Sequence, residues 1–103
     1  MLEVKPTIKL YHGTSKQYEQ SIAEKGLISD LTDNVHLTSD LEVAKRFSQK
    51  GAFDGYGGIV YEVDCPAMVA DGYIFYQSPV VLHTGITNHV PPKYLNKMDK
   101  EKS

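Results

Sequence analysis

Residues 10–15 read Leu-Tyr-His-Gly-Thr-Ser, and residues 34–40 read Asn-Val-His-Leu-Thr-Ser-Asp. Each stretch places a histidine, His12 or His36, between a strand-like apolar segment and small hydroxyl residues. Serine and threonine side chains accept hydrogen bonds from the first free N–H groups of a helix, so each stretch predicts a strand that gives way to a helix. Because both histidines lie at strand ends, we predict that their side chains line one cleft.

The first of these strands and its helix have clear boundaries in the sequence. Residues 7–12 have the alternation of polar and apolar side chains that is typical of a strand. Thr14 and Gln17 have the spacing of a capping box, which predicts that a helix starts there. The helix is expected to run to about Lys25 and to stop at Gly26, a residue type that commonly ends helices.

The second strand and helix repeat this pattern. Residues 35–38 predict a short strand, and Ser39 with Glu42 again has the capping-box spacing. Apolar residues spaced three apart predict one buried helix face. The residues expected on that face are Leu41, Ala44 and Phe47.

The second half of the chain is expected to consist mainly of strands. The glycine-rich residues 51–58 lack the Gly-Lys-Ser/Thr ending of a phosphate-cradling loop, so we interpret them as a connection. The Asp-Gly pair at 71–72 predicts a turn. Further strands are expected at residues 59–63, 73–76, 80–83 and 86–90. Two early helices with about six short strands predict an α+β fold, and composition and periodicity go no further.

Length and composition predict one domain without membrane spans. With 103 residues the chain has room for one core, so we expect a single domain over residues 1–95 and a charged, flexible tail at 96–103. No apolar run approaches the ~20 residues of a membrane span, and no signal peptide is predicted. The single cysteine, Cys65, excludes an intrachain disulfide and fits a cytoplasmic setting. The net charge of −2 argues against broad electrostatic binding of nucleic acid, and the oligomeric state is not indicated.

Further motifs follow the two histidine stretches in a fixed order. They are Val-Tyr-Glu-Val-Asp at 60–64, Asp-Gly at 71–72 and His-Val-Pro-Pro-Lys-Tyr-Leu at 89–95. The ordered series resembles the ADP-ribosyltransferase superfamily, and most closely the C-terminal lobe of the RNA 2′-phosphotransferase family, over residues 9–95. The resemblance implies a split pair of small antiparallel sheets, two N-terminal helices and an NAD cleft between the sheets. It also implies an NAD-dependent ADP-ribosyltransferase, of the glycosyltransferase class, with NAD as substrate.

The resemblance assigns roles to individual residues. It implies that His12 hydrogen-bonds the NAD ribose or backbone, that Gly13 lets the main chain approach the nicotinamide amide, and that His36 stacks on nicotinamide or contacts a ribose. For the third catalytic position, Gln77 is the polar candidate, and an apolar residue such as Val81 would match the 2′-phosphotransferase branch. The predicted catalytic residues are therefore His12, His36 and Gln77. The predicted NAD-binding residues are Tyr11, His12, Gly13, Thr14, Ser15, His36, Leu37, Thr38, Ser39 and Phe75.

Simpler interpretations of several side chains stay open. His12 or His36 alone is also compatible with a core histidine that bonds a carbonyl group. No paired cysteines or closely spaced histidines occur, so no metal is predicted. Cys65 is interpreted as a small buried residue rather than a nucleophile. The aromatic residues of the third expected strand are interpreted as core rather than as a platform for RNA bases: Tyr73, Phe75 and Tyr76.

The absence of an acidic residue near the third catalytic position indicates the chemical class of the acceptor. No acidic residue occurs in residues 77–95, although many relatives carry a glutamate at the third catalytic position. A phosphate monoester is already anionic near pH 7 and needs no general base. We therefore expect a terminal phosphate of RNA or DNA as acceptor, with protein as the other possibility. The expected cationic contacts are Lys9, Lys50 and Lys93.

Two departures from the family pattern bear on RNA. Only eight residues precede Lys9, so the N-terminal RNA-binding lobe of the family is expected to be absent. The chain has one arginine, Arg46, where the family uses several on the RNA phosphate, so removal of an internal 2′-phosphate is not expected. Three alternatives stay open: an NAD glycohydrolase, a protein mono-ADP-ribosyltransferase that acts as a toxin or in phage–host conflict, and a catalytically degenerate domain that binds NAD, ADP-ribose or a partner.

Overall fold

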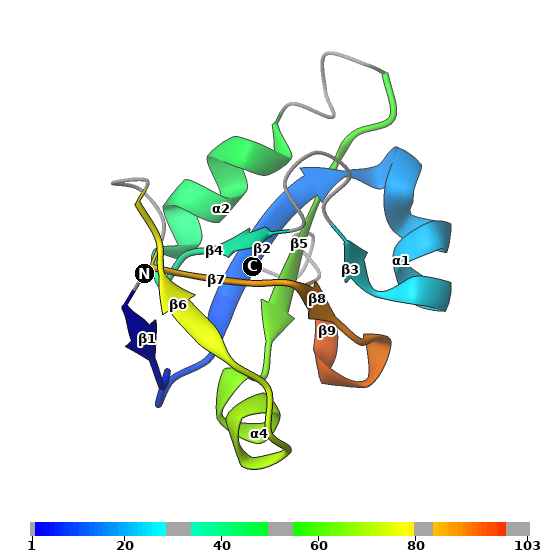
Figure 1. Ribbon diagram of the computed structural model, residues 1–103. Helices are drawn as coiled ribbons and strands as arrows, with labels where there is room; N and C mark the ends of the chain where they lie inside the picture. The colour runs from blue at the N-terminus through cyan, green and yellow to red at the C-terminus, as the bar shows by residue number, and fades with distance from the viewer. Residues whose placement is uncertain (1, 29–33, 50–54, 80–83, 99–103) are drawn as a thin grey trace.

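A computed structural model describes residues 2–28, 34–49, 55–79 and 84–98 (Figure 1). Its elements are, in chain order, strands β1 (Glu3–Val4) and β2 (Leu10–Ser15), 3-10 helix η1 (Lys16–Tyr18), helix α1 (Glu19–Lys25), strands β3 (Leu27–Ile28) and β4 (Val35–Leu37), helix α2 (Leu41–Ser48), strand β5 (Gly58–Val63), helix α4 (Cys65–Ala70), strands β6 (Phe75–Gln77), β7 (Gly85–Thr87) and β8 (His89–Val90), 3-10 helix η2 (Pro92–Tyr94) and strand β9 (Leu95–Met98). None of the described helices is long and apolar enough to span a membrane.

The described strands form three small antiparallel sheets. The strand orders are β1-β6-β7-β4 in the four-stranded sheet, β2-β5-β9 in the three-stranded sheet and β3-β8 in a two-stranded ribbon. The prediction of an α+β fold with small antiparallel sheets is therefore confirmed. Short strands suffice because the core lies between the sheets, and side chains from several strands fill it together.

The two larger sheets are joined where the two histidine stretches meet. The Tyr11 N–H donates to the Thr38 carbonyl over 2.7 Å, and the Thr38 N–H donates to the Tyr11 carbonyl over 3.0 Å. This antiparallel bridge brings β4 against β2, and Figure 1 shows β4 and β7 passing across β2 and β5. Leu10 and Leu37 beside the bridge are fully buried in the core. The bridge therefore places both histidine stretches over one hydrophobic core.

Helix α2 packs on the main chain of the three-stranded sheet through two glycines. A Cβ at Gly13 would lie 1.8 Å from the Ala44 carbonyl oxygen, and a Cβ at Gly58 would lie 2.1 Å from the Ser48 carbonyl oxygen. Both separations are far below van der Waals contact, so only glycine admits the helix at this distance. Gly13 is thus required by the fold, whatever a ligand does nearby.

This close approach also corrects the predicted buried face of the second helix. The buried side chains of α2 are Val43, Ala44 and Ser48. Of the residues predicted for that face, Ala44 is buried, whereas Leu41 and Phe47 are half-buried. Small side chains occupy the contact because the helix backbone itself lies against the sheet.

Three predicted boundaries shift by a few residues. The first strand covers residues 10–15 rather than 7–12, because it pairs with β5 along that whole length. The first helical turn is capped by Ser15 rather than Thr14, and α2 is capped by Asp40 rather than Ser39. In each case the capping side chain accepts a hydrogen bond from the N–H two residues later.

The second half of the chain differs more from the prediction. Helix α4 was not expected, although its capping residue Asp64 and the proline at the following helix start are recognisable helix signals. Residues 96–98, assigned to the tail, belong to β9, because β5 still has an open edge that residues 95–98 pair with. The predicted strand at 86–90 is divided into β7 and β8, which pair with different partners. The predicted strand at 80–83 and the tail beyond residue 98 lie outside the described residues.

Candidate functional site

A cleft of about 330 Å³ opens beside the bridge between β2 and β4. Five residues of the predicted site line it: Tyr11, His12, Gly13, His36 and Thr38. Six further lining residues were not predicted: Leu27, Ile28, Asn34, Val35, Ala44 and Phe47. The volume lies within the range of small-molecule sites in proteins.

A second hollow, of about 350 Å³, continues along β2 toward η1. It shares His12, Gly13 and Phe47 with the cleft and adds the predicted residues Thr14 and Ser15. The Ser15 hydroxyl is already engaged, because it accepts a hydrogen bond from the Gln17 N–H over 3.2 Å. An elongated ligand that followed β2 would therefore pass His12 in the middle of its length.

His12 has a defined tautomer in this site. Its Nδ1 lies 2.9 Å from the His36 carbonyl oxygen, and since a carbonyl can only accept, Nδ1 carries the proton. Burial lowers the pKa of His12 below its ordinary value, and the nearby His36 ring adds to this effect, although the bond to the His36 carbonyl opposes it. The ring is therefore neutral near pH 7 and presents Nε2 as a hydrogen-bond acceptor.

His36 lies on β4 and lines the same cleft as His12. Its side chain is half-buried, and its carbonyl group holds the His12 ring in place. The structure thus brings the two predicted catalytic histidines together in one cleft. Their catalytic roles stay predictions.

Two residues assigned to NAD binding lie instead in the core. Leu37 and Phe75 are 0% exposed. Successive side chains of a strand point to opposite faces, so Leu37 turns away from the side that carries His36. Phe75 pairs with Val4 on β1 and packs into the same core. Neither side chain reaches the cleft, which corrects both assignments.

Gln77 and Ser39 also lie away from the described lining of the cleft. Gln77 is exposed on β6, and strand β7 separates it from β4. The Ser39 side chain is exposed, and its hydroxyl accepts a hydrogen bond from the Thr84 hydroxyl over 3.1 Å. The resemblance made Gln77 the polar candidate for the third catalytic position, and a short motif does not reveal the order of the strands. Val81, the apolar alternative, lies outside the described residues.

The cleft-lining residues that were not predicted carry only weak signals in the sequence. Phe47 has helical spacing to Ala44 and was assigned to the core, although it lines both hollows. Ile28 is 54% exposed and follows the buried Leu27, as alternation along a strand produces, so its exposure gives no signal of its own. The short apolar step at residues 27–28 was visible in the sequence, but nothing local indicated that it borders the cleft.

The cleft lining that the structure describes includes no lysine or arginine. The lining residues that the structure describes include no acidic side chain.

Cys65 is fully buried, and burial raises the pKa of its thiol to about 12, which confirms it as a small core residue. Among the described residues, no group of three or more histidine, cysteine or acidic side chains is placed to hold a metal ion.

Fold and cleft together define a small α+β domain whose cleft offers a neutral imidazole, hydroxyl groups and aromatic surface to a polar organic ligand. A family model described as "RNA 2′-phosphotransferase, Tpt1 / KptA family" matches residues 2–84. The chain therefore belongs to this family, and the resemblance to RNA 2′-phosphotransferases predicted from the sequence is confirmed.

Curated relatives carry the name probable RNA 2′-phosphotransferase. The protein of Pseudomonas fluorescens strain Pf-5 is 39% identical over 79 residues, which cover 75% of this chain and 41% of the relative. That of Nostoc punctiforme is 37% identical over 95 residues, which cover 92% and 49%. That of Fusobacterium nucleatum is 34% identical over 95 residues, which cover 90% and 49%. This chain spans about half the length of the curated relatives it matches.

Proposed function

We propose that this chain binds NAD in the cleft between His12 and His36 and transfers its ADP-ribose unit to a phosphate acceptor on RNA. The observation that carries the proposal is the neutral His12 ring, which is held by the His36 carbonyl at the junction of two sheets. The arrangement of two small antiparallel sheets around this junction supports an ADP-ribosyltransferase-like fold. The names of the relatives support RNA as the acceptor.

Several features of the cleft support NAD as its ligand. The His12 Nε2 can accept a hydrogen bond from a ribose hydroxyl, which a protonated or differently oriented ring could not do. Thr14 adds a hydroxyl group in the second hollow, the Thr38 hydroxyl of the cleft already accepts a hydrogen bond from the Asp40 N–H, and Phe47 offers an aromatic surface to a base. Two adjoining hollows along β2 suit a ligand made of two nucleotides joined end to end.

The proposed transfer needs no general base from the described lining. The bond between the ribose carbon and the nicotinamide nitrogen breaks, and the bonding electron pair leaves with nicotinamide, which thereby becomes neutral. A phosphate oxygen of the acceptor forms the new bond to the same carbon and loses no proton, because it is already anionic. The chain would bind and orient the two substrates and exclude water from the oxocarbenium-like transition state.

NAD binding is tested first by titration calorimetry. His12→Ala removes the acceptor and should weaken binding by about 1–3 kcal/mol, the typical cost of leaving a buried polar partner unsatisfied. His89→Ala removes an exposed histidine outside the cleft and is the matched control. Equal affinities in both variants would exclude His12 from the NAD site.

Transfer is tested with adenylate-labelled NAD. The acceptors are RNA with one 2′-phosphate, RNA and DNA with terminal phosphates, dephosphorylated copies of each, and protein. Phosphate-dependent labelling of RNA supports the proposal. The sequence favoured a terminal phosphate, whereas the name of the relatives puts the 2′-phosphate first. Nicotinamide release without labelled acceptor would indicate a glycohydrolase, and NAD binding without release a degenerate domain. The relatives' names support no toxin role.

A further inference from the structure

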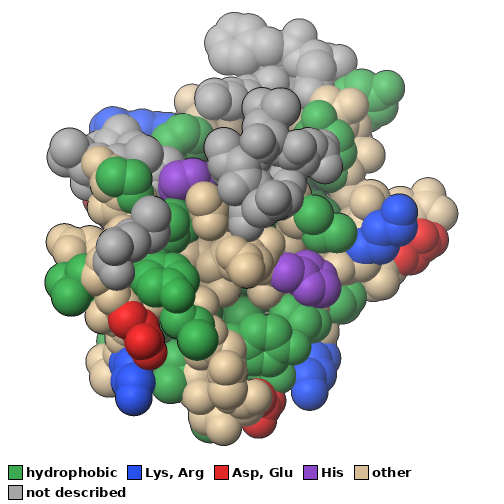
Figure 2. Space-filling model, viewed as in Figure 1, with side chains coloured by type: hydrophobic (Ala, Val, Ile, Leu, Met, Phe, Trp, Pro, Cys, Tyr) green, Lys and Arg blue, Asp and Glu red, His purple; other side chains and the backbone are tan. Residues whose placement is uncertain are grey.

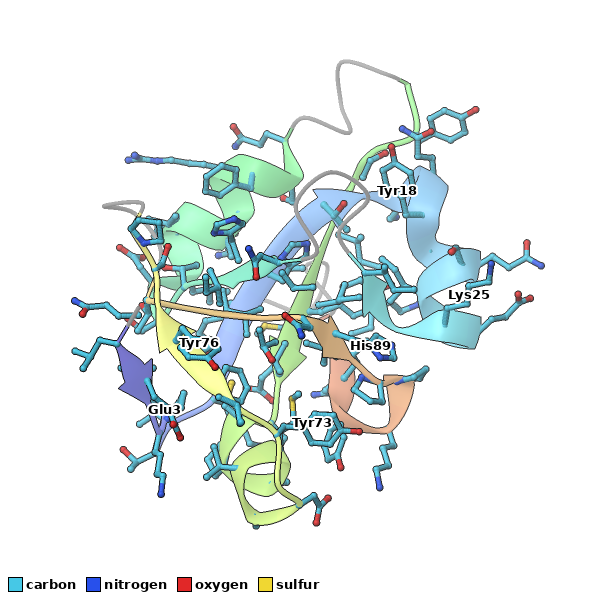
Figure 3. The ribbon with its side chains drawn as sticks, in the orientation of Figure 1. Glu3, Tyr18, Lys25, Tyr73, Tyr76 and His89 are labelled. Carbon is cyan, nitrogen blue, oxygen red and sulfur yellow. The ribbon has the colours of Figure 1, made fainter. Side chains whose placement is uncertain are left out.

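A third hollow, of about 350 Å³, lies apart from the cleft and has an aromatic lining. We call it the aromatic groove. The residues that define it are Tyr73, Ile74, Tyr76, Thr87, Asn88 and His89. Figure 3 shows Tyr73, Tyr76 and His89 on the same side of the molecule, around β6 and β8. The proposed binding and transfer of NAD uses none of these side chains.

Strand pairing places Tyr76 of the aromatic groove on the same sheet face as His36. Ile86 on β7 pairs with Tyr76 on one side and with His36 on the other. Directly paired residues of a sheet point to the same face, so Tyr76 and His36 share a face of the four-stranded sheet. Two strand spacings separate them, which is about 10 Å. Tyr76 at the edge of the aromatic groove therefore lies on the His36 side of the sheet, with the buried Ile86 between them.

The tyrosines of the groove are partly open to solvent. Tyr73 and Tyr76 are half-buried, whereas Phe75 between them turns inward and is fully buried. The prediction that the three aromatic residues of this strand are core is confirmed for Phe75, whereas Tyr73 is partly buried against the core and Tyr76 is half-buried. Ile74 is 50% exposed beside the two rings. These side chains offer flat and apolar surface in a hollow large enough for a small planar group.

Polar groups and a cation border the two rings. Asn88 is exposed and offers both a donor and an acceptor. The Tyr73 ring meets the Tyr94 ring edge-on, with centroids 5.5 Å apart, and the Lys93 Nζ lies 5.0 Å from the Tyr94 centroid. The Lys93 side chain is 71% exposed, although Asp71 lies 4.0 Å from its Nζ. A phosphate next to a base stacked on Tyr73 would therefore lie near a cation.

We propose that the aromatic groove binds nucleotides of a single-stranded nucleic-acid acceptor beside its reacting phosphate, with bases stacked on Tyr73 and Tyr76 and a backbone phosphate near Lys93. The nature of the acceptor rests on the proposed function. Stacking must supply most of the affinity, because the chain has a net charge of −2. Among the residues that Figure 2 colours by type, the charged side chains lie toward the rim of this face.

The test measures the anisotropy of a short fluorescein-labelled single-stranded RNA that carries one 2′-phosphate, at low ionic strength. Tyr76→Ala should weaken binding about 5- to 150-fold, the range for loss of one base–aromatic stack. Tyr76→Phe keeps the ring and should stay within about twofold of wild type. Tyr56→Ala removes an exposed tyrosine outside the groove and is the matched control. Tyr76→Leu replaces Tyr76→Ala if circular dichroism shows that the alanine variant is unfolded.

A second variant tests the phosphate contact. Lys93→Gln should make the slope of log K against log salt concentration less steep by about 0.7, the value for one phosphate contact on a single strand. An unchanged slope would remove Lys93 from the proposal.

NAD calorimetry on the same variants separates the groove from the cleft. Unchanged NAD affinity in Tyr76→Ala, together with weakened RNA binding, supports the groove. The groove proposal is overturned if Tyr76→Ala binds RNA as tightly as the wild type does, or if the wild type binds no RNA. It is also overturned if Tyr76→Ala loses the labelling of a protein acceptor and RNA is not the acceptor. If neither the wild type nor any variant binds NAD while RNA binding depends on Tyr76, the proposed function fails and the groove stands.

Discussion

Replacing Gly13 with alanine should destabilise the whole domain. The added Cβ would lie 1.8 Å from the Ala44 carbonyl oxygen, 2.8 Å from the Ala44 carbonyl carbon and 2.9 Å from the Ser48 nitrogen. All three atoms belong to the backbone of α2, so no side-chain rotation relieves the contact. Helix α2 would have to retreat by about 1.6 Å to restore an ordinary separation of 3.4 Å.

The expected cost follows from this displacement. Overpacking of a core typically costs about 1–3 kcal/mol, and a clash with helix backbone belongs at or above the upper end. A domain of this size has a free energy of unfolding of about 5–15 kcal/mol, so Gly13→Ala would remove a large part of it. A loss of about 3 kcal/mol corresponds to a melting temperature lower by about 12–24 °C.

Urea unfolding followed by circular dichroism measures this effect, and Gly85→Ala is the matched control. Gly85 is also a buried strand glycine, but a Cβ there would meet its nearest neighbour, the Tyr76 carbonyl oxygen, at 3.5 Å. That is ordinary contact, so Gly85→Ala should change stability by no more than about 1 kcal/mol. A loss in Gly13→Ala no larger than in Gly85→Ala would refute the packing argument.

The same variant separates two explanations of Gly13. The sequence suggested that its missing Cβ lets nicotinamide approach the main chain, whereas the structure fills that space with α2. Wild-type stability with loss of NAD affinity would favour the ligand explanation. Lost stability supports the packing explanation.

Three further predictions concern single side chains. Because burial lowers the pKa of His12 in the fold, the stability it contributes should be fully present above its unfolded value of about 6.5 and lost as pH falls below that value through the lower pKa of the folded state; urea midpoints at about pH 7.5 and 5.5 would show the loss, and His12→Gln should reduce it. Cys65, with its pKa raised to about 12, should resist iodoacetamide in the native protein and react only after unfolding; mass spectrometry that finds native alkylation would contradict this. Asp40→Ala removes the side chain that caps the Glu42 N–H and should cost about 0.5–2 kcal/mol in urea unfolding, while Ser39→Ala should cost under about 0.5 kcal/mol; equal losses would mean that the cap is misassigned.

Local features of the fold could be predicted from the sequence because their causes are local. A capping side chain acts within a few residues, so both strand-to-helix junctions were found, although each cap lies one residue later than predicted. The ordered motifs identified the family for the same reason, since each is a short run of residues. His12 and His36 were singled out by these runs, and both line the cleft.

The tertiary structure decided what depends on distant partners. Alternation predicts that His36 and Leu37 point to opposite faces, but only the pairing of β4 with β7 and its bridge to β2 determines which face is the core. Strand order separates Gln77 from the cleft, and residues 96–98 form a strand because β5 has an edge to pair with. Hydrogen bonds between strands join residues far apart in the chain, and no local pattern encodes which strands will meet.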